Sequence, residues 1–363
     1  MTERGLYVHI PFCTDICSYC DFVKVFYRET TADAYLEALA EEISRRVKGA
    51  VSSIYVGGGT PSALNETQFR RLLSLLSAFH REGNSFTLEA NVESLNEEKI
   101  ALLKTYGVNR VSLGVQSLNE KMIALMNRHH DFRQVKETIG RLNAAGIEDI
   151  NCDLIYALPG ETDEILQSDL EALLSLPITH LSAYGLMIND HTCLKIRKYR
   201  EADDETYRRQ YDRIVSVLEE NGLFRYEVSN FARKGRESQH NLLYWKNREY
   251  YGVGVGAASY IGDERSDNTH SLSAYLRGKT EGTKEKLTKE DRRFYHLMLG
   301  LRLAEGVDLE EYRALYGENL TDRYADKFAA LKAENLIEID RGHLKITREN
   351  LYIMDYVLKK LLF

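Results

Sequence analysis

The stretch Cys13-Thr14-Asp15-Ile16-Cys17-Ser18-Tyr19-Cys20 holds three of the five cysteines of the chain. It directly follows residues 6–10, a short apolar run that is typical of a buried strand. Thiolates are soft ligands that bind zinc or iron–sulfur clusters. Structural zinc takes four protein ligands, and no second cysteine pair exists, because Cys152 and Cys193 are single and distant. The spacing therefore favours a [4Fe–4S] cluster with one iron open to a small chelating ligand; zinc and inert core cysteines are the alternatives.

The first half of the chain alternates short β-branched runs with longer helical patterns, which predicts an α/β fold. Strand, helix and strand repeated about six times imply parallel strands joined by right-handed crossovers. Such units form either an open, incomplete barrel or a doubly wound sheet, and in both the functional residues follow the carboxyl ends of the strands. The six predicted strands are residues 6–10, 53–56, 86–90, 110–115, 151–156 and 180–186.

Local signals predict where some helices begin. Leu36, Leu39 and Ile43 form the apolar stripe of a first helix. Asn65 is followed three residues later by Gln68, a pattern that resembles a capping box, and Ser94 with Glu97 suggests a second helix start of the same kind.

Polar or glycine residues also stand where strands are expected to end. Residues 57–61 read Gly-Gly-Gly-Thr-Pro, and glycines let a ligand approach the backbone, whose free N–H groups can hold a carboxylate. Glu89 and Gln116 end the third and fourth strands, and Asp153 lies within the fifth. A carboxylate beside ribose hydroxyls or an ammonium group forms charge-assisted hydrogen bonds. These residues are therefore candidate ligand contacts.

The pattern changes near residue 199, which predicts a first domain over residues 1–198 and a C-terminal α+β domain over residues 199–363. Residues 199–287 form a linking segment that is rich in tyrosine and glycine. Residues 288–363 suggest helices followed by a hairpin at 336–346, which resembles a small winged-helix unit. Cys193 lies in a polar loop and receives no role.

The overall composition narrows the function. The net charge of −7 and the pI near 5.9 argue against a nucleic-acid partner. No run of about 18 apolar residues predicts a membrane span, and the first ten residues lack the features of a signal peptide. We therefore expect a cytoplasmic protein.

The cysteine loop after the first strand resembles the signature of the radical S-adenosylmethionine (SAM) superfamily. The resemblance implies that the open iron chelates the amino and carboxylate groups of SAM. It also implies that one electron from the cluster splits the sulfonium bond and frees a 5′-deoxyadenosyl radical. The cofactor carries this chemistry, while the protein positions the reactants and excludes water.

Over residues 5–355 the chain is similar to the oxygen-independent coproporphyrinogen III oxidase family, through motifs at 7–13, 57–61, 114–117 and 153–160. The likeness implies a partial, TIM-like (β/α)6 radical SAM barrel followed by the C-terminal domain of that family. It implies that Cys13, Cys17 and Cys20 bind the cluster. The SAM contacts that it implies are Tyr7, Gly58 and Glu89 for the cluster-bound SAM, Tyr19 as an aromatic contact, and Gly59, Thr60, Gln116, Arg128 and Asp153 for a second SAM position.

Two departures separate the chain from the decarboxylating branch of this family. That branch has a fourth cysteine two residues after the triplet, where this chain has Phe22, and a long N-terminal extension, where only six residues precede Tyr7. Both features resemble the haem chaperone branch, HemW. That branch also carries a His-Asn-x-x-Tyr-Trp element, which matches residues 240–245 and contains the only tryptophan of the chain.

Imidazole can ligate haem iron, so His240 in this element is a candidate haem ligand, and packing at the domain junction is the alternative. The resemblance implies a haem chaperone that binds haem as cargo and delivers it to acceptor haemoproteins, including acceptors at the membrane surface. An electron donor such as flavodoxin or ferredoxin would be a further partner. The alternative is an oxygen-independent coproporphyrinogen III oxidase, which converts propionates to vinyl groups; a zinc-stabilised scaffold is a third reading.

Overall fold

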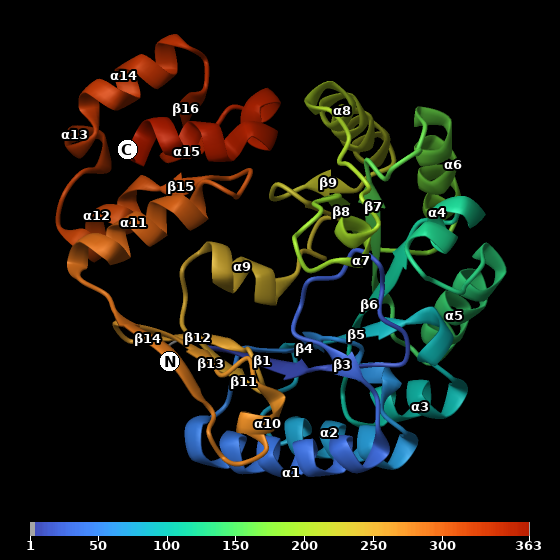
Figure 1. Cartoon of the computed structure of the whole chain (residues 1–363). Coiled ribbons are helices and arrows are strands. Elements are labelled where there is room, and N and C mark those ends of the chain that lie inside the picture. Colours follow the sequence, from blue (N-terminus) through green and yellow to red (C-terminus); the bar gives the residue numbers. More distant parts are fainter. Residues whose placement is uncertain (1–3, 363) are drawn as a thin grey trace.

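The structure, a computed structural model, describes residues 4–362 and is organised around one curved sheet (Figure 1). The strands of this sheet follow the order β14-β13-β12-β11-β1-β4-β5-β6-β7-β8-β10-β9. The six strands predicted from the sequence are neighbours in the middle of the sheet, and each pairs with the next in parallel. They are β1 (Gly5–Ile10), β4 (Ser53–Gly58), β5 (Ser85–Asn91), β6 (Arg110–Gln116), β7 (Asp149–Tyr156) and β8 (His180–Gly185).

A helix follows each of the six strands and covers the outer face of the curved sheet (Figure 1). The predicted stripe of Leu36, Leu39 and Ile43 is buried against the sheet in the first of these helices. The arrangement is a partial TIM-like barrel, which confirms the predicted fold class and selects the barrel over the doubly wound sheet. The outer helices are α1 (Glu29–Arg46), α2 (Glu66–Ser77), α3 (Glu97–Thr105), α5 (Phe132–Ala144), α6 (Asp163–Leu174) and α8 (Asp204–Glu220), with the short α4 (Glu120–Leu125) before α5.

The two predicted helix starts have different outcomes. Asn65 and Gln68 form the capping box of α2, with both reciprocal hydrogen bonds present. The prediction for Ser94 is wrong, because residues 92–94 form a short 3-10 turn and Asn96 caps α3 instead. The Ser94 hydroxyl pairs with that of Ser62 at 2.6 Å, so it joins two loops at the carboxyl ends of the strands.

Strands from the second half of the chain extend both edges of the sheet. On one side β11 (Tyr250–Val253) pairs with β1 in parallel, and β12 (Ala258–Ile261), β13 (Glu264–Asn268) and β14 (Glu281–Lys286) follow. On the other side β10 (Asn230–Ala232) and β9 (Phe224–Arg225) follow β8. The strands between residues 199 and 287 thus belong to the same sheet as the six barrel strands, and the short helices α9 (Gln239–Trp245) and α10 (Leu272–Tyr275) lie between them in the chain.

The last part of the chain has its own hydrophobic core, formed by residues between 297 and 361. Its helices pack on a three-stranded antiparallel sheet of order β15-β17-β16, whose hairpin turn contains Gly342 with φ of +84°. This matches the predicted helices and hairpin. The elements are α11 (Lys289–Gly300), β15 (Val307–Asp308), α12 (Leu309–Tyr316), α13 (Leu320–Arg323), α14 (Ala325–Ala333), β16 (Ile337–Asp340), β17 (His343–Ile346) and α15 (Met354–Leu362).

The strands of the barrel alternate between two kinds of side chain. In β6, Val111, Leu113 and Val115 belong to the hydrophobic core under the helices. Ser112 and Gln116 alternate with them and line the inner face of the barrel. The inside of this barrel is therefore polar, unlike the usual TIM barrel, whose interior is filled by branched apolar residues. None of the helices between residues 4 and 362 has the length and apolarity to cross a membrane.

Candidate functional site

The cysteine loop leaves the barrel immediately after β1. Its two ends are held together by β2 (Phe12–Cys13) and β3 (Val25–Phe26), which pair in parallel. The buried ring of Phe12 anchors this base by edge contacts with Tyr27 and Tyr35. Residues 14–24 therefore project over the carboxyl ends of the strands, which is where a barrel places its functional groups.

The three thiols of this loop line one cavity of about 360 Å³ at the mouth of the barrel. Two polar side chains approach them. The Thr60 hydroxyl donates to Cys13 Sγ at 3.6 Å, and Arg128 donates to Cys17 Sγ at 3.9 Å. Burial raises the pKa of Cys13 to about 11 and also raises the pKa of Cys20. A cysteine binds metal as a thiolate, and burial makes that charged form unfavourable. We therefore expect these thiols to lose their protons only when bound metal offsets the cost of the buried charge.

The glycine loop after β4 serves a different purpose from the one expected. A Cβ at Gly57 would lie 2.7 Å from the Glu89 carboxylate, and a Cβ at Gly58, where φ is +109°, would overlap the His9 ring. The Gly58 N–H donates to Glu89 at 3.1 Å, and the Gly59 N–H donates to the carbonyl of Ile10. The prediction that these N–H groups are free for a ligand carboxylate is therefore wrong, since groups of the protein already occupy them.

Two half-buried carboxylates lie in the wall of the cavity. Glu89 accepts from Tyr55 at 2.8 Å, and Asp153 accepts from Asn151 at 2.8 Å. Burial raises the pKa of Glu89 to about 7, and the nearby Asp153 adds to the rise. Burial also raises the pKa of Asp153. Two carboxyl groups that are costly to ionise side by side favour a cationic ligand between or beside them.

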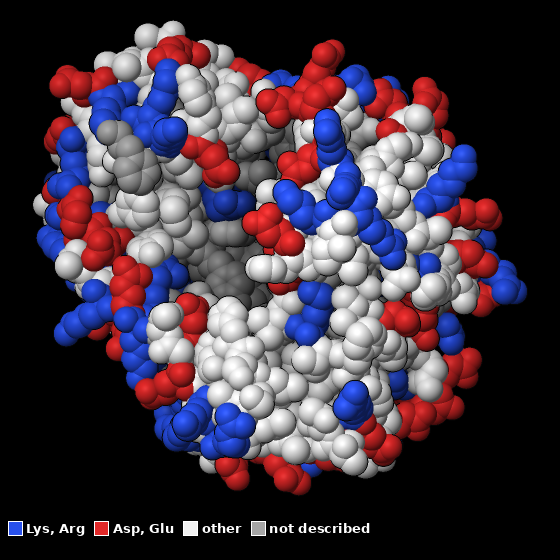
Figure 2. All heavy atoms as spheres, in the orientation of Figure 1, with Lys and Arg blue, Asp and Glu red and all other residues white. Residues whose placement is uncertain are grey.

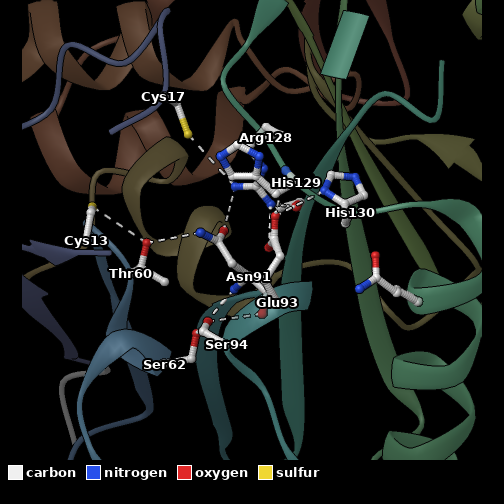
Figure 3. A network of polar contacts seen from close by, with 12 residues as sticks. Cys13, Cys17, Thr60, Ser62, Asn91, Glu93, Ser94, Arg128, His129 and His130 are labelled. Carbon is white, nitrogen blue, oxygen red and sulfur yellow. Dashed lines mark hydrogen bonds and ion pairs between the residues drawn. The ribbon is translucent and has the colours of Figure 1, made fainter. Parts of the chain in front are cut away.

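Arg128 connects the cysteine loop to the carboxyl ends of two strands, β5 and β6 (Figure 3). Its guanidinium is buried and donates to Asn91 at 2.8 Å and to the carbonyl of Gly114, besides its contact with Cys17. It also forms an ion pair of 3.4 Å with Glu93. Burial would raise the pKa of Glu93, but a hydrogen bond from His130 and the charge of Arg128 outweigh it and lower the pKa to about 2.

Gln116 stands at the carboxyl end of β6 with φ of +70°, a conformation that is rare for a residue with a side chain. The register of β6 and β7 shifts between Gly114 and Gln116, so a bulge turns this residue toward the cavity. Strained residues that a structure holds in place are concentrated at functional sites. The strain supports Gln116 as a ligand contact.

Most of the predicted site residues meet in this one cavity. Tyr7 and His240 are the exceptions. Tyr7 stacks on Tyr55, which lines the cavity, and its hydroxyl pairs with His9 Nδ1 at 3.1 Å. The predicted residues that line the cavity are Cys13, Cys17, Tyr19, Cys20, Gly58, Gly59, Thr60, Glu89, Gln116, Arg128 and Asp153.

The sequence did not predict two cationic residues that line the cavity, Lys24 and Arg110, and Arg110 lies at the start of β6. Arg110 is the buried one of the two. Arg110 is 3% exposed, its Nε has no hydrogen-bond partner, and this Nε lies 3.9 Å from Oδ1 of Asp149. Asn151, Ser182 and Tyr184 from the next two strands line the same wall. Polar and apolar residues alternate along these strands, and this alternation in the sequence could have identified the side chains that face the inside of the barrel.

His240, the candidate haem ligand, lies outside the cavity. It lies on α9 at the end of the barrel where the strands begin, beside Gly5 and Ser53. Nδ1 pairs with the Ser53 hydroxyl and Nε2 with the Tyr244 hydroxyl, both at 2.8 Å. Burial lowers the pKa of the ring to about 3. The burial of the ring and its two hydrogen bonds favour the alternative of packing, and haem ligation by His240 stays a prediction.

The donor set fits the cofactors that the sequence implies. The three cysteines share one loop and one cavity, and a cluster bound by three thiolates keeps an open iron. SAM carries a sulfonium and an ammonium group, and the half-buried carboxyl groups of Glu89 and Asp153 can supply the negative charge that pairs with such cations. Among residues 4–362 no three His, Cys, Asp or Glu side chains are arranged to hold a single metal ion.

Comparison with known proteins agrees with this geometry. A family model described as the radical SAM superfamily matches residues 7–173, and one described as the HemN C-terminal domain matches residues 287–353. The protein named Heme chaperone HemW from Lactococcus lactis is 38% identical, and the match covers 99% of this chain and 97% of the relative. The protein of the same name from Bacillus subtilis is 32% identical over 95% of this chain and 96% of its own.

Among solved structures, coproporphyrinogen III oxidase (HemN) from Escherichia coli, described as a radical SAM enzyme, superposes with a TM-score of 0.87. The two chains are 24% identical, and the match covers 99% of this chain and 90% of that one. At this level of identity the match establishes a common fold over the whole chain.

Proposed function

This chain belongs to the HemW family of radical SAM proteins, and on that premise we propose that it is a haem chaperone. It binds haem as its cargo and delivers it to acceptor haemoproteins. The relatives that carry this name match the chain over nearly its full length, so the proposal covers the barrel and the C-terminal unit together.

The observation that carries the proposal is the position of Phe22. Its side chain is 65% exposed and lines the mouth of the cavity, directly beyond Cys20 and Asp21. The decarboxylating branch of the similar family, from which this chain departs, has a cysteine there. A phenyl ring supplies neither a thiol nor a proton donor, but it gives the mouth an apolar contact surface. The rim is therefore better suited to hold a flat, apolar ligand than to assist chemistry on it.

The residues of the cavity would hold the two cofactors in defined roles. Cys13, Cys17 and Cys20 would bind the cluster, and Arg128 would keep Cys17 beside positive charge. Glu89, fixed by Tyr55 and the Gly58 N–H, would accept from the ammonium group of SAM. Tyr7, Tyr19, Gly59, Thr60, Gln116 and Asp153 would complete the SAM contacts. When bound, the cluster supplies one electron and SAM supplies a sulfonium bond that this electron can break.

The partners follow from this role. Haem is the cargo, and a flavodoxin or ferredoxin would reduce the cluster. Acceptor haemoproteins, including acceptors at the membrane surface, would receive the haem. We place the protein in the cytoplasm, where an oxygen-sensitive cluster and reduced cysteines are maintained. Its net charge of −7 gives no reason to include nucleic acid among the partners.

The alternative function is that of an oxygen-independent coproporphyrinogen III oxidase, which is worth testing because the chain shares the fold of HemN. One anaerobic experiment separates the two functions. The protein with a reconstituted cluster is loaded with haem and mixed with the apo form of a respiratory haemoprotein, and the Soret band is followed. In parallel, reduced protein is incubated with SAM and coproporphyrinogen. We expect haem transfer and no protoporphyrinogen; turnover to protoporphyrinogen without haem transfer would establish the alternative.

A further inference from the structure

The connection from β8 into α7 (Cys193–Ile196) and beyond, residues 184–200, is an unusual surface that we call the β8–α7 segment. Its inner side is firmly attached. Leu186 and Leu194 are buried in a small core that also contacts Tyr19. The Leu194 N–H donates to the carbonyl of Ser18 at 3.0 Å, between two cluster cysteines. The segment therefore rests directly on the cysteine loop.

The segment exposes large apolar side chains. Ten such side chains are exposed over residues 4–362, and four of them, Tyr184, Met187, Ile196 and Tyr199, lie in this segment, the first two at the edge of the cavity. Met187 is 68% exposed and Ile196 is 73% exposed. A hydrogen bond from Asn189 to Asp21 brings Phe22 to the same rim. Exposed apolar surface gathered in one place marks a binding site more often than scattered residues do.

The same segment presents three side chains of the types that ligate haem iron. Met187, His191 and Cys193 lie within seven residues, and all three are exposed. Thr192 between the last two is buried and caps α7, so the histidine and the cysteine are held at the surface on either side of it. No hydrogen bond engages any of these three side chains in the part of the chain that the structure describes. Imidazole, thiolate and thioether are the usual axial ligands of haem.

The charge of the segment also suits haem. It contains four basic residues and one acidic residue, Asp190, in a chain whose net charge is −7. Lys195 pairs with Asp190 at 3.6 Å, but Arg197, Lys198 and Arg200 are exposed and bind no acidic side chain among the described residues. Figure 2 shows Lys and Arg side chains gathered over the α7 and α8 part of this face. These cations match the two propionate groups of haem.

The cavity itself leaves haem little room. Ligand pockets usually measure roughly 300–1,000 Å³, and this cavity of about 360 Å³ would also hold a cluster and SAM. Its wall contains ionisable side chains, the half-buried Glu89 and Asp153 and the buried Arg110, which a porphyrin face would not satisfy. A porphyrin would therefore lie on the rim, where the exposed apolar side chains are.

We infer that haem binds on the β8–α7 segment. Its ring lies against Met187 and Ile196, its propionates pair with Arg197 and Arg200, and its iron is ligated by His191 or Cys193. The inference rests on the proposed function and deepens it by assigning the cargo a site that borders the cluster loop. The segment is exposed on its outer side, so substitutions there test binding without disturbing the core.

The test is an anaerobic haem titration of the full chain with its reconstituted cluster, followed by the Soret band. The double variant His191→Ala/Cys193→Ser is expected to weaken haem binding by at least about tenfold. The single variants identify the ligand, because imidazole and thiolate give different Soret positions and electron paramagnetic resonance signals. Arg197→Ala/Arg200→Ala is expected to weaken haem binding but to leave binding of haem dimethyl ester unchanged, since the ester lacks the propionate charges.

The matched control is His270→Ala/Leu315→Ala, which removes an exposed histidine and an exposed leucine elsewhere on the surface. Failure of the wild-type chain to bind haem at all would overturn the proposed function. Wild-type haem binding that the His191→Ala/Cys193→Ser variant retains in full would overturn the present inference alone. The same result combined with slower reduction of the cluster by flavodoxin would identify the segment as a docking surface for the electron donor.

Discussion

The inside of the barrel and the core of the C-terminal unit are assembled from opposite kinds of side chain. Arg110 is buried in the barrel and Glu89 and Asp153 are half-buried there, although removing charge from water costs free energy unless a partner compensates. The core around Leu301 and Leu344 is almost wholly apolar and needs no ligand. The difference indicates that the inside of the barrel is suited to binding ligands, whereas the core of the C-terminal unit serves stability alone.

The largest effect is expected from the cysteine loop. Replacing Cys17 by Ala removes one of three thiolates, so the reconstituted protein should lose nearly all of its cluster iron. Cys152→Ala is the matched control, because Cys152 is buried in the barrel core and should leave the iron content unchanged. Iron and sulfide analysis after anaerobic reconstitution checks both. Full iron in Cys17→Ala would show that this cysteine is not a ligand.

The second prediction addresses the C-terminal core. Leu344 on β17 is fully buried, and truncating such a leucine to alanine costs about 2–5 kcal/mol of stability. Thermal unfolding of Leu344→Ala should therefore begin at a clearly lower temperature than in the wild type. SAM affinity, measured by calorimetry below that transition, should stay the same. A change in SAM affinity would mean that the two regions are coupled.

The third prediction concerns Glu89. Its folded-state pKa of about 7 lies above its ordinary value of 4.5, so the folded chain holds an extra proton between these two pH values. Stability that depends on this proton is present below pH 4.5 and is lost as the pH rises through 7, by up to about 3 kcal/mol. Glu89→Gln, which cannot ionise, should therefore gain stability relative to the wild type at pH 8.

The same Glu89→Gln variant should bind SAM more weakly, because the amide cannot pair with the ammonium group. Wild-type affinity should fall as the pH drops below 7 and the carboxylate is protonated. Thermal unfolding at pH 5 and 8, together with SAM titrations at both values, checks the two expectations. A variant that binds SAM as well as the wild type at pH 8 would remove Glu89 from the SAM contacts.

The smallest effect is expected from His240→Ala. The haem Soret band should not move, because the ring is buried and both nitrogens are engaged within the protein. The loss of two hydrogen bonds should lower the stability by about 1–3 kcal/mol, as measured by thermal unfolding. A shifted Soret band would return His240 to the haem site.

The sequence predicted the strands and helices of this molecule better than their exact ends and their long-range contacts. The six strands were found to within about two residues, because β-branched runs separated by amphipathic helices carry a strong local signal. Ser94 failed as a helix cap because a 3-10 turn, which no local pattern indicated, displaced the start of α3 to Asn96. Local signals specify elements well and their exact ends less well.

Long-range contacts account for the remaining differences. The pairing of β11 with β1 joins residues more than two hundred positions apart, and nothing in residues 250–253 indicates it. The glycine loop was correctly placed beside the site, but its N–H groups bind Glu89 and Ile10 instead of a ligand. The exposure of His191 and Cys193 likewise depends on how Thr192 and Leu194 are buried, which the sequence alone does not reveal.

The position of α9 has a consequence for how ligands enter and leave the cavity. This helix lies across the end where β1 and β4 begin, so molecules exchange with the cavity at the opposite end, beneath the cysteine loop and the β8–α7 segment. If SAM binds in the cavity first, haem that then binds on the β8–α7 segment would cover the mouth of the cavity and prevent SAM from leaving. The two ligands would therefore bind in a fixed order, SAM before haem. Haem would have to dissociate before a used SAM molecule could be exchanged.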